Sequence, residues 1–227
     1  ISVTIGNTVS IIGAYSFKGS GVSEVLIGNN VRAIREHAFS QCANLKNVTV
    51  PDSVTSIEAY AFDNCDLESI YILGNVRFGN NVFNAASSLT TVNLLGSEVS
   101  FGDNIFNECT SITSLGFGSK NVVNAFNSYY SDKDRITSVT LSETVDGNEF
   151  QESAFSSYTN LASVELHSNS AVSNFQTIFA NLPSSIQSLS IGDGVTEIGT
   201  NSFTNCSNLI SVTIGNTVSI IGAYSFK

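Results

Sequence analysis

The chain has 227 residues, of which 42% are hydrophobic and only 12% are charged, and its formal net charge is −10. This acidic balance argues against a nucleic-acid partner, because phosphate binding requires a basic surface. No apolar run approaches the roughly 20 residues of a membrane-spanning helix, so the sequence predicts no transmembrane segment.

A phenylalanine recurs along the chain at a mean interval of about 23 residues. The recurring positions are Phe17, Phe39, Phe62, Phe83, Phe106, Phe126, Phe155, Phe179, Phe203 and Phe226. Upstream of these positions the chain reads apolar-x-x-apolar-x-apolar, as in Leu45, Val48 and Val50. The last two apolar residues alternate with polar ones and are often β-branched, which predicts a short strand with one buried face.

In the regular units a turn rich in Gly, Asn and Asp follows the strand, and then a second apolar pair such as Val54 and Ile57. One coil cannot bury its own apolar residues, whereas stacked coils share a continuous core. The sequence therefore predicts a single repeat solenoid over residues 1–227 with about ten coils. We expect a parallel β-sheet on one face and short helical or irregular turns on the other.

The segment from Leu45 to Cys65, LKNVTVPDSVTSIEAYAFDNC, resembles the BspA-like subclass of leucine-rich repeats. That subclass has coils of about 23 residues that read roughly L-x-x-I-x-I-P-x-x-V-x-x-I-G-x-x-A-F-x-x-C, and the resemblance weakens between Phe83 and Phe179. It implies the leucine-rich-repeat fold. It also implies a surface or secreted protein with a role in adhesion to host matrix proteins or cells.

The first eighteen residues, Ile1–Lys18, are identical to Ile210–Lys227 at an offset of 209 residues. Neighbouring coils agree only at pattern positions, so folding constraints alone do not explain identity at exposed positions. We expect a 209-residue block followed by the start of its next copy, without terminal caps. This predicts a window from a longer array or a subunit that associates end to end.

Four cysteines each follow a repeat phenylalanine by three residues: Cys42, Cys65, Cys109 and Cys206. We interpret them as small buried residues in equivalent positions, with a disulfide between Cys42 and Cys65 on adjacent coils as the alternative. No cluster with metal-ligand spacing and no nucleophile beside His37 or His167 is recognisable, so neither an enzyme nor a cofactor or metal site is expected.

The residues between the apolar strand positions face outward and form a broad surface rich in hydroxyl groups and poor in charge. This surface is either a binding face for proteins or glycans or simply a soluble sheet face. The candidate binding residues on it are Thr4, Glu24, Thr49, Tyr71, Thr91, Thr140 and Glu165.

The largest break in the period lies at about residues 127–150, where an irregular insertion is expected. Its paired tyrosines, Tyr129 and Tyr130, suit a contact surface, and the alternative, which the sequence favours, is a tolerated insertion. Two triplets of the Asn-x-Ser/Thr type make Asn47 and Asn205 candidate glycosylation sites.

These observations predict a non-enzymatic repeat protein that is extracellular or at the cell surface and forms a long solenoid or fibre for adhesion or as a surface coat. One alternative is a monomeric adhesin that binds host matrix proteins or glycans through the sheet face. The other is an intracellular scaffold for protein interactions.

Overall fold

The computed structural model describes residues 1–227 and divides into two compact units, Ile1–Ile112 and Thr113–Lys227. Both units consist of short parallel strands joined by turns, and helices occur in the second unit alone. The predicted fold, a repeat solenoid with a parallel sheet, is confirmed. Each coil contributes a strand of four residues whose second and fourth side chains point inward, as the alternating pattern requires.

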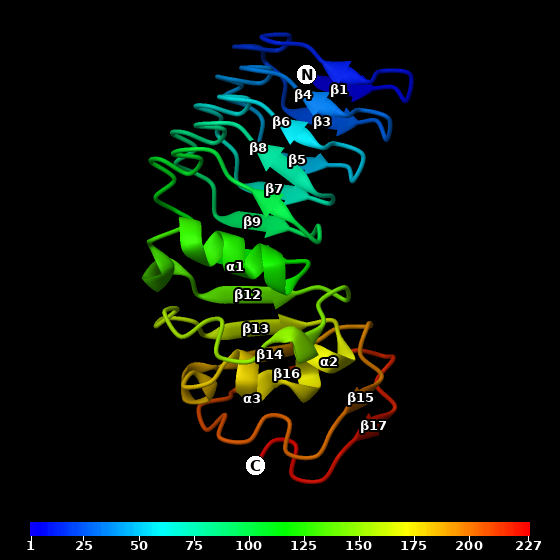
Figure 1. Ribbon diagram of the computed structural model, residues 1–227, viewed down its shortest axis with the longest axis vertical. Helices are drawn as coiled ribbons and strands as arrows, with labels where there is room; N and C mark the ends of the chain where they lie inside the picture. The colour runs from blue at the N-terminus through cyan, green and yellow to red at the C-terminus, as the bar shows by residue number, and fades with distance from the viewer. The chain divides into compact units, whose positions relative to one another are not determined.

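In the first unit the four-residue strands lie one after another, as Figure 1 shows. They are β1 (Ser2–Ile5), β3 (Glu24–Ile27), β5 (Asn47–Val50), β7 (Ser69–Ile72) and β9 (Thr91–Leu94). β1 pairs with β3, and β5 pairs with β7, which pairs with β9, all in parallel. A second parallel sheet contains β2 (Ile11–Ile12), β4 (Ala33–Ile34), β6 (Ser56–Ile57), β8 (Val76–Phe78) and β10 (Val99–Ser100).

In the second unit five strands pair in parallel: β11 (Ser114–Phe117), β12 (Ser138–Leu141), β13 (Ser163–Leu166), β14 (Ser188–Ile191) and β16 (Ser211–Ile214). β15 (Glu197–Ile198) pairs with β17 (Ile220–Ile221). Between strands the chain forms α1 (Lys120–Tyr129), α2 (Asn169–Ser173) and α3 (Phe175–Ile178). Three short 3₁₀ turns complete the unit: η1 (Lys133–Arg135), η2 (Gly147–Glu149) and η3 (Pro183–Ser185).

A column of stacked phenylalanine rings runs through the core of the first unit. Neighbouring rings in the column Phe17, Phe39, Phe62, Phe83 and Phe106 lie 5.1 to 5.7 Å apart between centroids and are tilted by at most 15°. The rings of Phe39, Phe62 and Phe83 are completely buried. The recurring phenylalanine of the sequence is therefore one of the core residues through which successive coils contact each other.

Each coil of the first unit bends sharply around its phenylalanine through two residues with positive φ, one placed two positions before the ring and one two positions after it. The first set is Tyr15, His37, Tyr60, Asn81 and Asn104, and the second is Gly19, Gln41, Asn64, Ala85 and Glu108, with φ between 51° and 66°. Only one of these residues is glycine, although the left-handed region costs other residues about 1–2 kcal/mol.

Hydrogen bonds between coils offset this cost. In the first bend the backbone N–H groups of Tyr15, Phe17 and Gly19 donate to carbonyl oxygens of the next coil at 3.0, 2.8 and 2.8 Å. The intervening N–H groups of Ser16, Lys18 and Ser20 close turns within their own coil. Since buried backbone groups must find partners, this alternation holds the bend in place even where the sequence lacks glycine.

We expect Ala85→Gly to stabilise the protein by about 0.5–1 kcal/mol, because glycine adopts positive φ without the steric cost that alanine pays. Ala85 has a φ of 56°, and its N–H still donates to Asn107 at 2.9 Å. The adjacent Ala86, which is completely buried and has no positive φ, is the matched control. Ala86→Gly is expected to destabilise by about 1 kcal/mol. Urea unfolding of both variants measures the two effects, and a loss of stability in Ala85→Gly contradicts the assignment.

The four cysteines are free thiols, and Cys42, Cys65 and Cys109 are buried. Each of these three Sγ atoms donates to a phenylalanine carbonyl of the preceding coil, at 3.1, 3.0 and 3.0 Å respectively. Contact with the Cys42 thiol, together with burial, raises the pKa of Cys65, and burial raises the pKa of Cys109 to about 12. The Cys65 and Cys109 thiols therefore stay protonated and act as small donors that link neighbouring coils, whereas the hydrogen bond with Cys65 lowers the pKa of Cys42.

Candidate binding face

The outward residues of the first unit form in-register rows because the side chains of a strand alternate between its two faces. On β3 and β5 the second and fourth residues are buried, whereas the first and third are exposed. Thr49 is in register with Tyr71, and Tyr71 in turn with Asn93. Asn93 is only 9% exposed, so the accessible part of this row ends at Tyr71.

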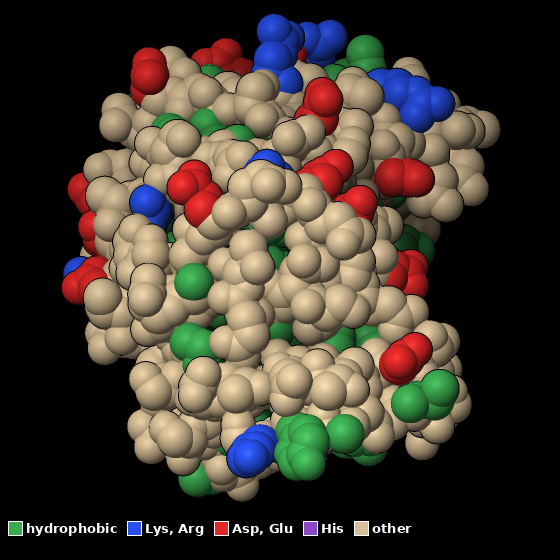
Figure 2. Space-filling view, turned by 60° about the horizontal axis from the view of Figure 1, so that its bottom comes forward, with side chains coloured by type: hydrophobic (Ala, Val, Ile, Leu, Met, Phe, Trp, Pro, Cys, Tyr) green, Lys and Arg blue, Asp and Glu red, His purple; other side chains and the backbone are tan.

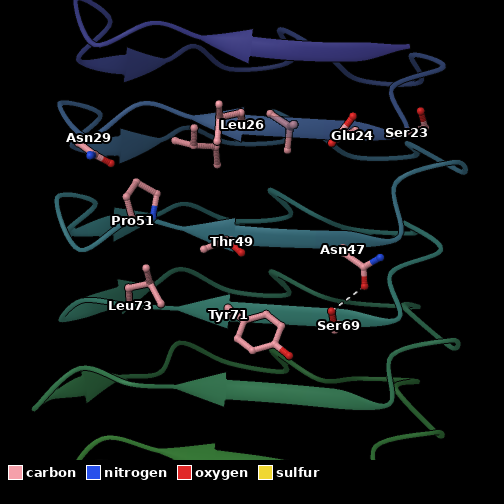
Figure 3. A pocket seen from close by; sticks show the side chains of 12 residues that line it. Ser23, Glu24, Leu26, Asn29, Asn47, Thr49, Pro51, Ser69, Tyr71 and Leu73 are labelled. Carbon is pink, nitrogen blue, oxygen red and sulfur yellow. Dashed lines mark hydrogen bonds between the residues drawn. The ribbon is translucent and has the colours of Figure 1, made fainter. Parts of the chain in front are cut away.

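A pocket of about 710 Å³ lies on this outward face and is built from β3, β5, β7 and the turns that follow them. Figure 3 shows its side chains projecting from successive strands toward one side of the sheet. The apolar part comprises Leu26, Thr49, Pro51, Tyr71 and Leu73. Leu26, Tyr71 and Leu73 are 65%, 40% and 41% exposed, which is unusual for large apolar side chains.

The polar part of the pocket lies toward the beginning of the same strands. Glu24 and Asn47 each occupy the first position of their strand, and Ser69 does so on β7. The Ser69 hydroxyl donates to Asn47 Oδ1 at 2.7 Å, the contact drawn in Figure 3. Glu24 contributes the only formal charge of the lining. Exposed apolar side chains beside a few polar groups and one carboxylate are the composition of a candidate binding site.

No group of three or more His, Cys, Asp or Glu side chains in the structure is arranged to hold a metal ion. None of the helices combines the length and apolarity needed to cross a bilayer.

On the face seen in Figure 2 the surface is mostly neutral, and acidic side chains stand in small groups between wider neutral areas.

The repeats also match a described family. The family model of the BspA type leucine rich repeat region, in 6 copies, matches residues 10–129 and 123–227. The chain belongs to this family. The resemblance seen in the segment from Leu45 to Cys65 is thereby confirmed for most of the sequence, including the part between Phe83 and Phe179 in which the repeat pattern is weaker.

Three solved leucine-rich repeat proteins resemble this BspA-type chain at low identity. One from Bacteroides ovatus is 20% identical, with a TM-score of 0.46, and the match covers 100% of this chain and 63% of that protein. One from T. pallidum is 20% identical, with a TM-score of 0.39 and coverages of 98% and 73%. A leucine rich cell surface protein from Faecalibacterium prausnitzii is 18% identical, with a TM-score of 0.31 and coverages of 95% and 79%. A comparison with curated proteins finds no match.

The remaining candidate residues of the BspA-type sheet lie apart from the pocket. Thr4 is exposed on β1, whereas Thr91, Thr140 and Glu165 are half-buried. In the second unit the Thr140 hydroxyl donates to Glu165 at 3.3 Å, and Glu165 also contacts His167 Nε2 at 3.1 Å. These polar side chains contact one another and do not line the pocket.

The expectation that Tyr129 and Tyr130 both face a partner is wrong for Tyr130. This residue is 8% exposed, and its ring lies 5.1 Å from that of Phe126. Helix α1 causes this, because Val122, Val123 and Phe126 recur with helical spacing and Tyr130 continues the same buried stripe. Tyr129 ends the helix and is half-buried. The apolar spacing from Val122 to Tyr130 would have revealed the helix in the sequence.

The two candidate glycosylation residues are both exposed. Asn47 begins β5 and lines the pocket, and Thr49 of its triplet points to the same face of the strand. Asn205 lies in a bend with a φ of 68°. The sequence-based set omitted Leu26, Pro51 and Leu73, which form much of the pocket. A leucine at an outward strand position, where the repeat otherwise carries mostly polar residues, was the signal for this site.

Proposed function

We propose that this chain is a non-enzymatic protein of the cell surface or extracellular space that binds other macromolecules through the outward face of its first unit. The observation that carries the proposal is the pocket on β3, β5 and β7, in which Leu26, Tyr71 and Leu73 stand exposed together. Grouped apolar side chains on a surface mark interaction sites, whereas singly scattered ones do not. Membership of the BspA-type family favours a role in adhesion.

Immunolabelling and an adhesion assay test this proposal together. Antibodies are expected to label intact cells as strongly as permeabilised ones. The purified chain is expected to bind at least one of three coated surfaces, carrying fibronectin, collagen or mucin. Leu26→Ser should weaken that binding about tenfold, as truncation of a central contact does.

Ile11→Ser is the matched control, because Ile11 is also an exposed apolar side chain of the first unit, at 46%, but belongs to β2. Labelling that appears only after permeabilisation would favour an intracellular scaffold. Equal binding by Leu26→Ser and the unchanged chain would remove the pocket from the proposal.

A fibre is the second candidate, and the identity of Ile1–Lys18 with Ile210–Lys227 favours it. The offset of 209 residues corresponds to nine intervals between the recurring phenylalanines. Electron micrographs of the native material are then expected to show rods with an axial repeat of about 43 Å, or nine strand spacings of about 4.8 Å. Isolated short particles would leave the monomeric binding protein as the better description.

A further inference from the structure

We propose that the pocket of the first unit binds an extended peptide, with an apolar side chain seated between Leu26 and Tyr71 and a basic side chain two residues away at Glu24. This inference rests on the proposed function, since it names the class of ligand for the same face. The ligand is a peptide in which the apolar and the basic side chain have a defined spacing, and the side chains that line the pocket specify both.

The apolar slot arises from one small residue between two large ones. Leu26 stands on β3 and Tyr71 on β7, with Thr49 of β5 between them. β5 pairs with β7 and lies beside β3 without pairing to it, so the two large side chains are separated by at least two strand spacings, or about 10 Å. That gap is wide enough for one aliphatic side chain to lie over Thr49, in contact with both walls.

Apolar surface extends from the slot along the direction of the strands. Pro51 follows Thr49 by two residues, and Leu73 follows Tyr71 by two residues. Leu73 is 41% exposed and therefore retains apolar surface that a ligand can cover. Removing such surface from water is favourable. An aliphatic side chain fits a slot whose walls are Leu26 and the ring of Tyr71, since both walls then lose apolar surface to the ligand.

The charge at the other end of the pocket specifies the second group of the ligand. Glu24 is exposed and takes part in no ion pair of the structure. The pocket lining contains no lysine, arginine or histidine. Lys46, which precedes β5, is already paired with Asp66 and lies 3.5 Å from Glu68. A ligand with a cationic side chain at this end therefore complements the pocket.

The distance between the two subsites matches the geometry of an extended chain. Glu24 precedes Leu26 by two residues on β3, and the slot over Thr49 lies one strand further, so the two subsites are roughly 8 Å apart, about the span of alternate side chains of an extended chain when the basic one is a long lysine or arginine. A ligand with an apolar residue and a lysine or arginine separated by one residue can therefore occupy both subsites at once.

Fluorescence anisotropy with labelled, capped peptides in glycine-serine frames tests this spacing. The probes carry Leu-x-Lys or Lys-x-Leu, and the controls carry Ser-x-Lys, Leu-x-Gln and adjacent Leu-Lys. At least one spaced peptide is expected to bind, and replacement of its leucine by serine should weaken binding about tenfold. Glu24→Gln should weaken binding of the lysine peptide about two- to fivefold. The same variant should leave binding of the glutamine peptide unchanged.

Leu26→Ser is expected to abolish discrimination between leucine and serine peptides, whereas Glu98→Gln, a carboxylate of the first unit outside the pocket, serves as the charge control. Equal affinity for spaced and adjacent peptides would overturn the inference. Binding of mucin oligosaccharides at this pocket would also overturn it, if Leu26→Ser weakens that binding and none of the peptides competes with it. In that case the proposed function stands and only the ligand class is wrong. If Leu26→Ser changes neither adhesion nor peptide binding, both fail.

Discussion

Phe62→Ala is expected to lower the free energy of unfolding by about 3–5 kcal/mol, the range for removal of a fully buried aromatic side chain. The ring of Phe62 is completely buried and lies 5.3 Å from Phe39 and 5.7 Å from Phe83 between centroids. The substitution therefore opens a cavity between two coils and removes two stacked aromatic contacts at once. Urea unfolding, followed by circular dichroism, measures the loss.

Leu26→Ala is the control for the Phe62 prediction, because it also shortens a large apolar side chain of the first unit. At 65% exposure this leucine contributes little to the core, so its free energy of unfolding should change by no more than about 0.5 kcal/mol. A Phe62→Ala protein with nearly unchanged stability would contradict the assignment of the ring column as a contact between coils.

Gly194→Ala is expected to destabilise the protein by about 2–3 kcal/mol, near the upper end of the usual cost of overpacking. A Cβ atom at Gly194 would lie 1.9 Å from the carbonyl oxygen of His167 on the preceding coil. That oxygen belongs to the backbone, so the coil itself must shift to accept a methyl group. The backbone φ of Gly194 is not positive, so the requirement for glycine here comes from the close approach of two coils.

The matched substitution is Gly199→Ala in the same unit, where a Cβ atom would meet only Ser202 Oγ at an ordinary 3.5 Å. We expect a change in the free energy of unfolding of no more than about 0.5 kcal/mol for this variant. Comparison of the urea midpoints of the two proteins checks the difference. If the two variants are equally stable, the coils are not packed as closely at Gly194 as the structure indicates.

Repetition explains which features the sequence could reveal. Val48 and Val50 point inward on β5, and equivalent residues recur in coil after coil because each coil needs them to form its strand. The same argument identified the phenylalanine column. The candidate pocket depends instead on departures from the pattern such as Leu26, which a search for shared positions discards. The residues with positive φ could not be located from the sequence, because residues such as Tyr60 and Ala85 adopt a backbone conformation usually associated with glycine.

Helix α1 escaped prediction for a different reason. The sequence around it was interpreted only through the interval between phenylalanines, which is 20 residues before Phe126 and 29 residues after it. A longer interval indicates extra chain but not its conformation. The buried stripe of Val122, Val123 and Phe126 repeats with the period of a helix rather than with that of the coils. Local periodicity and repeat length are thus separate signals and must be examined separately.

The hydrogen bonds at the bends all run in one direction, opposite to those beside the strands, where Arg32 and Arg35 donate to the preceding coil. Tyr15, Phe17 and Gly19 all donate toward the next coil, as do Asn201, Phe203 and Asn205 in the second unit. Peptide dipoles that are hydrogen-bonded head to tail add along the row, as they do in a helix. A stack therefore presents backbone donors at the bends on one end and acceptors on the other. At these bends alone, a head-to-tail junction would bring donors to acceptors, whereas a head-to-head junction would place donors against donors.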